Sequence, residues 1–186
     1  YISKHEITYS QYDFFCDETN REKPPEIFVW GSYDRRGRFP VVSISWNDAA
    51  AFCAWLSQRT GEKIYLPTEA QWEKAARGTR QYRYPWGDSD PTCSTANHFG
   101  CGNSESWYGV LTHVGLHSSG LSPYGVHDMA GNAWEWCRDW YSETYYSIST
   151  KKTNNPQGPG TGSYRVIRGG GIDSKSGDLR SAARHY

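Results

Sequence analysis

The chain has 186 residues and a mass of 21.2 kDa, which suits one domain that buries roughly 70% of its unfolded surface. Its 20 Lys and Arg balance its 20 Asp and Glu, so charge gives no argument for binding nucleic acid or an anionic membrane. No run of roughly 18 apolar residues occurs, so no membrane-spanning helix is predicted. The aromatic fraction of 16%, with 19 Gly and 9 Pro, predicts a loop-rich domain whose core is built on large rings.

Three capping boxes predict three short helices in the first half of the chain. They lie at Thr8–Gln11, Ser45–Asp48 and Thr68–Gln71. In each, a hydroxyl accepts a hydrogen bond from a free backbone N–H, and the side chain three positions later reaches back. Apolar residues follow at helical spacing, and Gly61 and Gly78 are expected to end the second and third helices.

Strands are predicted over residues 1–8, 40–45 and 164–168, where apolar or β-branched residues dominate. Loops are predicted in the polar stretches broken by Pro and Gly, at residues 21–40, 88–122 and 141–163. Loops of this length in a compact domain need a metal, a disulfide or aromatic packing to hold them.

The five cysteines leave the cellular compartment open but favour export. Cys16 and Cys53 lie in apolar helical patterns, which is typical of small core residues. Cys93 and Cys101 flank a short stretch and are placed to form a loop disulfide, and Cys137 follows a tryptophan-rich segment. No Cys-x-x-Cys pair occurs, which argues against a zinc ribbon or a thioredoxin-like motif.

The segment from Tyr124 to Trp140 places a carboxylate, Glu135, between two tryptophans. An ionised carboxylate among large rings needs a partner. One interpretation is a buried ion pair or hydrogen-bond network. The other is an oxygen-rich cation site with Asp128, Asn132 and Glu135 as side-chain ligands, and spacing alone does not decide between them.

Six motifs in a fixed order resemble the formylglycine-generating enzyme (sulfatase-modifying factor) domain family. They cover nearly the whole chain, at residues 2–8, 40–46, 66–73, 84–87, 131–136 and 165–170. The resemblance implies a single domain over residues 1–186, of α+β class with a C-type-lectin-like fold and little regular secondary structure.

The resemblance also implies cofactors. The family carries structural calcium, and one such site maps onto Asp128, Asn132 and Glu135, which favours the cation interpretation of this segment. A second family calcium site begins at an Ala-Asn pair, and only Asn97 is carried over from it. The family's enzymes oxidise a substrate cysteine to formylglycine with copper and two cysteines that follow the Arg-Gly-Gly motif.

The chain departs from that enzyme pattern, since residues 171–186 contain no cysteine. Without thiolates, Cu(I) has no obvious ligand and no positioned thiol transfers a proton. We therefore expect no copper and no formylglycine-generating activity. His185 remains, but a single histidine there is more typical of a surface residue.

The same segment resembles the variable proteins of diversity-generating retroelements, a group with this fold that includes surface lipoproteins of spirochaetes. Leu179–Arg184 matches the fixed core of their variable region. Most flanking residues can arise by adenine changes in Asn-type codons; that criterion is permissive, and Lys175 needs another template codon. The alternative is an ordinary degenerate family member with a tolerant loop. The predicted variable, ligand-binding positions are Ile172, Asp173, Ser174, Lys175, Ser176, Gly177, Asp178, Ala183, His185 and Tyr186.

In this interpretation Arg180 and Arg184 are scaffold residues paired with buried carboxylates, and Leu179 and Ala182 pack inward, while the variable positions point outward. The family pattern continues with a Gly-Phe-Arg strand that is missing here. We therefore expect the chain to be truncated at its C-terminus.

The sequence thus predicts a non-enzymatic receptor or adhesin for an unknown protein or carbohydrate ligand. We expect a monomer without nucleic acid or direct membrane insertion, exported to a bacterial cell surface, with any lipid anchor outside the sequence shown. The alternatives are a copper-dependent formylglycine-generating oxidase, or another enzyme of this fold such as an iron-dependent sulfur-inserting one. An iron-dependent sulfur-inserting enzyme would use a histidine cluster with a carboxylate. Only His113 and His117 are suitably spaced, and both are expected to be solvated loop residues.

Overall fold

The computed structural model describes residues 1–25, 37–101, 110–148 and 154–186. Parts of the three predicted loops, at 26–36, 102–109 and 149–153, lie outside the described residues. The helices are α1 (Tyr9–Thr19), α2 (Trp46–Thr60), α3 (Glu69–Arg77), a short 3₁₀ turn η1 (Ser118–Gly120) and α4 (Tyr145–Ile148). The strands are β1 (Glu135–Trp140) and β2 (Arg165–Arg168). No helix in this part of the chain is long and apolar enough to cross a bilayer.

The three predicted helices form behind the three predicted capping boxes. Thr8, Ser45 and Thr68 each accept from the backbone N–H three residues on, and the side chain at that position bonds back to the cap. Gly61 and Gly78 end α2 and α3, as predicted. Each cap satisfies donors that a helix cannot satisfy itself, worth about 1 kcal/mol per cap.

Strands β1 and β2 form a two-stranded antiparallel ribbon, with Glu135 opposite Arg168 and an irregular register before Trp140. A further antiparallel bridge joins Ile167 to His185, so the last residues lie along β2. The strands predicted at 1–8 and 40–45 were wrong. These segments meet in only one bridge, Thr8 with Pro40, because they have no neighbouring strand to extend the ladder among the described residues.

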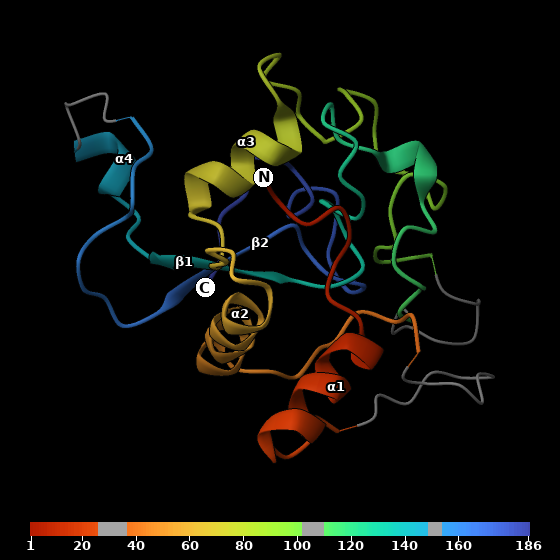
Figure 1. Cartoon of the computed structure of the whole chain (residues 1–186). Helices are drawn as coiled ribbons and strands as arrows, with labels where there is room; N and C mark the ends of the chain where they lie inside the picture. The colour runs from red at the N-terminus through yellow and green to blue at the C-terminus, as the bar shows by residue number, and fades with distance from the viewer. Residues whose placement is uncertain (26–36, 102–109, 149–153) are drawn as a thin grey trace.

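The two faces of the ribbon pack against different helices. Figure 1 shows α3 on one side of β1 and β2, and α1 and α2 on the other. On the α3 side, Trp72 is completely buried and belongs to the main core cluster, which also contains Cys137 and Val166. On the α2 side, the Arg165 guanidinium lies between the rings of Trp46 and Trp140, 3.7 and 3.6 Å from their centroids.

The long loops are held by cross-links and backbone contacts. The predicted disulfide between Cys93 and Cys101 is present. Within the loop it closes, the Asn97 carbonyl accepts a 2.7 Å hydrogen bond from the backbone N–H of Asn132. This contact joins the disulfide loop to the tryptophan-rich segment and fixes the position of both.

Candidate functional site

A buried ion network underlies the last residues of the chain. Arg168, fully buried on β2, contacts Glu69 at 3.2 Å and Glu73 at 2.8 Å, both on α3. It also donates a 2.7 Å hydrogen bond to the Ser181 carbonyl. Arg184 forms a bidentate pair with Glu69, at 2.6 and 2.8 Å. The predicted pairing of Arg184 with a buried carboxylate is therefore present, and β2, α3 and the terminal segment share one charge cluster.

A sharp turn follows the ribbon at Gly169 and Gly170, whose φ values of 91° and 83° favour glycine. A Cβ on Gly170 would lie 2.8 Å from the Leu179 side chain. Ser174 closes the turn, since its Oγ accepts a 2.9 Å hydrogen bond from the Gly171 N–H. The start of the terminal segment is therefore fixed by backbone geometry and one buried hydroxyl.

Most of the predicted variable positions lie outward, but three do not. Ser174, which closes the turn, and Ala183 are buried, and the half-buried Ile172 packs against the core cluster that contains Leu111 and Ala133. The remaining predicted positions are exposed or half-buried: Asp173, Lys175, Ser176, Gly177, Asp178, His185 and Tyr186.

The fixed motif also has a different orientation from the predicted one. Leu179 is buried as expected, but Ala182 is exposed and Ala183 takes the inward position. Arg180 is exposed and its guanidinium donates to the Gly177 carbonyl rather than to a buried carboxylate of the described residues, so the predicted partner was wrong for it. The reason is local: the Ala183 N–H bonds to the Arg180 carbonyl, and this turn carries Ala183 to the interior.

His185 and Tyr186 close the segment against the tryptophan and tyrosine rings. The His185 ring lies 4.8 Å from that of Trp134, and its Nε2 is 3.2 Å from Asp178 Oδ1. The Tyr186 ring lies 4.6 Å from Tyr141. Both side chains stay at least partly accessible, and the backbone of His185 is bonded to Ile167 of β2, a combination that suits a binding surface.

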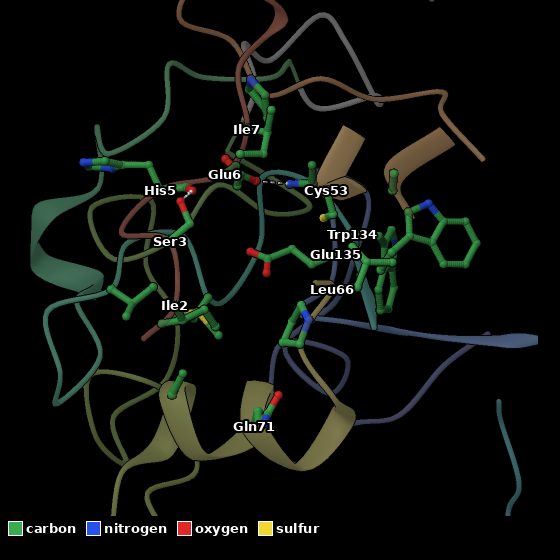
Figure 2. A pocket seen from close by; sticks show the side chains of 18 of the residues that line it. Ile2, Ser3, His5, Glu6, Ile7, Cys53, Leu66, Gln71, Trp134 and Glu135 are labelled. Atoms are coloured by element: carbon green, nitrogen blue, oxygen red, sulfur yellow. Dashed lines mark hydrogen bonds between the residues drawn. The ribbon is translucent and has the colours of Figure 1, made fainter. Parts of the chain in front are cut away.

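A large pocket borders this segment. Its wall includes residues 1–7, one side of α2 with Phe52 and Leu56, the segment 62–67, one side of α3, and residues 171–173. Figure 2 shows Glu135 pointing into it, with Glu6 and His5 above and Gln71 of α3 below. Asp173 also lines the pocket, so the terminal segment and the carboxylate-bearing segment face the same hollow.

The residues predicted as cation ligands are brought together only in part. Asp128 is buried, and its Oδ2 accepts from the Gly115 N–H at 2.6 Å. Glu135 Oε2 accepts from Trp72 Nε1 at 2.7 Å and keeps its second oxygen for another partner. Asn132 Oδ1 already accepts three hydrogen bonds, two of them from Thr112.

Asn97 is buried beside Asn132 but uses its amide nitrogen there. The nitrogen donates to Asn132 Oδ1 at 3.1 Å and to the Val110 carbonyl at 2.8 Å. Asn132 therefore joins several loops by hydrogen bonds. Of the four predicted ligands, only the carboxylates of Asp128 and Glu135 remain suited to binding a hard cation.

Glu6 lies beside this group and was not among the predicted ligands. Its carboxylate accepts from Asn132 Nδ2 at 2.8 Å and from the Ala133 N–H at 3.1 Å. These partners are more than a hundred positions away in the sequence, so no local pattern identified it. The only available signal was an acidic residue just before the Thr8 cap.

Burial perturbs the carboxylates around the pocket. Desolvation raises the pKa of Glu6 well above its ordinary value, and repulsion from Asp128 and Glu135 adds to the shift. Desolvation likewise raises the pKa of Glu135 to about 7, although the Trp72 hydrogen bond opposes this. When ionised, Glu6 and Glu135 form no ion pair with a cationic side chain of the described residues, and a bound cation would supply the missing positive charge.

The three free cysteines do not form an activated thiol site. Burial raises the pKa of Cys16, Cys53 and Cys137, so each thiolate is disfavoured. His113 is exposed, but the prediction that His117 is solvated was wrong. His117 is buried, with its ring nitrogens 3.1 Å from Thr112 Oγ1 and from the Cys93 carbonyl.

A family model described as sulfatase-modifying factor enzyme 1-like domain matches residues 1–186. The formylglycine-generating enzyme of Streptomyces coelicolor is 42% identical over 164 residues, covering 80% of this chain and 48% of that protein. The serine/threonine-protein kinase pkn1 of Chlamydia caviae is 42% identical over 149 residues, covering 80% of this chain and 21% of that protein. The inactive C-alpha-formylglycine-generating enzyme 2 of Mus musculus is 36% identical over 161 residues, covering 78% of this chain and 42% of that protein. The chain thus spans between about a fifth and a half of these relatives.

Solved structures share the fold. PvdO of Pseudomonas aeruginosa superposes with a TM-score of 0.75 over 98% of this chain and 72% of that one, at 23% identity. Treponema denticola variable protein 1 superposes with a TM-score of 0.74 over 97% of this chain and 76% of that one, also at 23% identity. The predicted α+β fold with little regular secondary structure is confirmed, as is the resemblance in fold to a variable protein.

Proposed function

Because the chain belongs to the sulfatase-modifying factor enzyme 1-like family, we propose that it is a non-enzymatic member that binds a ligand through a variable face formed by residues 171–186. One observation carries the proposal: the division of that segment into buried anchors and outward positions. Arg184, Leu179 and Ser174 anchor it, while residues such as Lys175 and Tyr186 are exposed. A surface on a rigid base binds with a low ordering cost.

The chemistry of the thiols supports a non-enzymatic member. The last segment has no cysteine, and burial raises the pKa of all three free thiols elsewhere. The thiolate is the form that binds copper and reacts. The relatives include an enzyme and a protein named as inactive, so similarity alone does not assign the activity.

The outward positions offer varied chemistry. Asp173 and Asp178 carry acidic groups and Lys175 a basic one, while Tyr186 presents an exposed ring. Tyrosine and mixed polar residues are typical of adaptable recognition surfaces. A protein or carbohydrate ligand fits this surface, while the neutral balance of charge gives no support for nucleic acid.

Sequencing the locus in many cells tests the retroelement origin of this face. Substitutions should cluster at the outward positions, while Ser174 and Ala183 should stay constant because both are buried. A uniform locus would reject variation, and changes spread evenly over anchors and outward positions would reject the proposed face.

A direct assay tests the competing oxidase function. Purified protein with copper, oxygen and a Cys-x-Pro-x-Arg peptide should leave the peptide mass unchanged. Formation of the aldehyde would establish the copper-dependent oxidase instead. A known formylglycine-generating enzyme in the same buffer serves as the positive control.

Calcium is the structural cofactor that we propose, held by Asp128 and Glu135. Asp128 is buried, and its charge adds to the desolvation that raises the pKa of Glu135, so a divalent cation would neutralise both carboxylates and stabilise the long loops. In calcium, Glu135→Gln should lower the melting temperature and remove its dependence on a chelator. Identical melting curves of the unmodified protein with and without chelator would reject the site.

We propose that the protein is an exported monomer on a bacterial cell surface. The Cys93–Cys101 disulfide supports an oxidising environment. Protease treatment of intact cells should remove the protein, and light scattering of the purified chain should give the monomer mass. Protection from protease in intact cells that is lost on lysis would reject surface display.

A further inference from the structure

The loop closed by the disulfide contains a third group suited to binding metal. Ligand atoms of Cys93, His98 and Cys101 all lie within 4.8 Å of one another. We propose that reduction of the disulfide turns this loop into a zinc site with Cys93 Sγ, Cys101 Sγ and His98 Nε2 as ligands. The site is separate from the carboxylates proposed to hold calcium, and it does not depend on the proposed binding function.

The tautomer of His98 favours this role. Its Nδ1 lies 2.8 Å from the Phe99 carbonyl, which only accepts hydrogen bonds, so Nδ1 carries the proton. The lone pair is then on Nε2, which is buried and has no hydrogen-bond partner among the described residues. A histidine whose other nitrogen donates to a carbonyl is the form usually found as a zinc ligand.

The change of state is a balanced two-electron reduction. A dithiol gives two electrons and two protons to the Cys93–Cys101 bond, which becomes two thiols while the dithiol becomes a disulfide. When zinc binds, each thiol releases one proton to solvent. Two thiolates and one neutral imidazole then balance the charge of Zn²⁺ and leave a fourth position for water.

The loop is held by contacts other than the disulfide. The Ala96 N–H donates to the Thr92 carbonyl at 3.0 Å, and the Cys101 N–H donates to the His98 carbonyl at 3.0 Å. The buried contact between Asn97 and the tryptophan-rich segment fixes its middle. The cysteine Cα atoms are 5.3 Å apart, so the thiols are already gathered when the bond opens.

The donor set selects the metal. Two thiolates and an imidazole suit Zn²⁺ and related soft or borderline ions, whereas Ca²⁺ and Mg²⁺ require oxygen ligands. Cys93 is exposed, so both the reductant and the ion reach the site from solvent. Oxidised protein should therefore not bind zinc here, and reduced protein should.

Cobalt titration tests the proposal, since Co²⁺ bound to thiolate gives a charge-transfer absorption band. The full chain is compared before and after reduction with a phosphine, with excess reductant removed under anaerobic conditions, and Zn²⁺ is then used to displace Co²⁺. The band of reduced protein should saturate at one Co²⁺ per chain, and oxidised protein should give no band. Absence of the band after reduction would overturn the proposal, whether or not the fold survives reduction.

Variants distinguish metal binding at this site from metal binding by the free cysteines elsewhere in the chain. The double change Cys93→Ser and Cys101→Ser should abolish the band, while Cys53→Ser, at a free cysteine elsewhere, should keep it. His98→Gln should weaken Zn²⁺ binding by at least the roughly 10- to 100-fold that loss of a mere supporting partner costs. Unchanged affinity in the His98 variant would reject the three-ligand site.

Discussion

The segments 128–135 and 171–186 border the same pocket but are held in different ways. In the first, almost every residue is committed: the Asn132 side chain alone takes part in five hydrogen bonds, and Asp128 and Asn132 adopt positive φ. In the second, a few buried anchors hold a segment in which most other side chains are exposed or half-buried. The first segment therefore tolerates little substitution, whereas the second can change at many positions without loss of the fold.

The largest effect should come from removing the shared arginine beneath the terminal segment. Arg168→Ala removes the positive charge that is paired with Glu69 and Glu73. It should destabilise the protein by about 3–5 kcal/mol, because it breaks a buried ion network. Arg180→Ala is the matched control at an exposed arginine and should change stability by no more than about 0.5 kcal/mol. Urea denaturation measures both, and equal losses would contradict the assignment of anchors.

A backbone change should have the next largest effect. Gly170→Ala places a Cβ against Leu179 at a φ of 83° and should cost about 1–3 kcal/mol through strain. Gly177→Ala is the control, since a Cβ there meets nothing within 4 Å and its φ is not positive. That change should be neutral or stabilise by about 0.4–1 kcal/mol. If thermal unfolding shows both substitutions to be harmless, the turn does not hold the segment.

The carboxylates of the first segment give a pH test in the metal-free protein. The pKa of Glu135 is raised in the folded state from 4.5 to about 7, so the folded state holds this proton more tightly than the unfolded state. The resulting stabilisation is fully present below about pH 4.5 and is lost as the pH rises through about 7.

Glu135→Gln should remove this part of the pH dependence in the presence of chelator. At pH 8 the variant should be at least as stable as the unmodified protein, because the uncharged amide still accepts from Trp72. Glu143→Gln, at an exposed position, is the control. Comparing variants is necessary because burial lowers the pKa of His5, whose contribution is lost as the pH falls. Identical melting-temperature profiles for both variants would show that Glu135 is not desolvated.

Local chemistry made part of this structure predictable from sequence. The capping boxes at Thr8, Ser45 and Thr68 identified all three main helices, because a cap satisfies its own helix within four residues. The Cys93–Cys101 disulfide was likewise predictable, because it closes a short loop. The strand at 164–168 was correct for the same reason, since β-branched residues mark it locally.

Long-range pairing made the rest unpredictable. Arg168 was identified only as a strand residue, yet it is the buried centre of the ion network, because its partners Glu69 and Glu73 lie on α3. Glu6 was missed because its partners are 126 and 127 positions away. In the terminal segment, the inward position fell to Ala183 rather than Ala182, since turn hydrogen bonds rather than periodicity set the orientation there.

A pair of serine substitutions separates an anchor from an exposed position within one turn. Ser174→Ala removes the acceptor for the buried Gly171 N–H and should cost about 1–3 kcal/mol if that N–H stays dry, or about 0.5–1.5 if water replaces the hydroxyl. Ser176→Ala changes an exposed side chain and should stay within about 0.5 kcal/mol. Because the two serines are two positions apart and chemically identical, composition cannot explain a difference between them. Equal values in urea denaturation would mean that the segment is not divided into anchors and outward positions, and the proposed face would lose its physical basis.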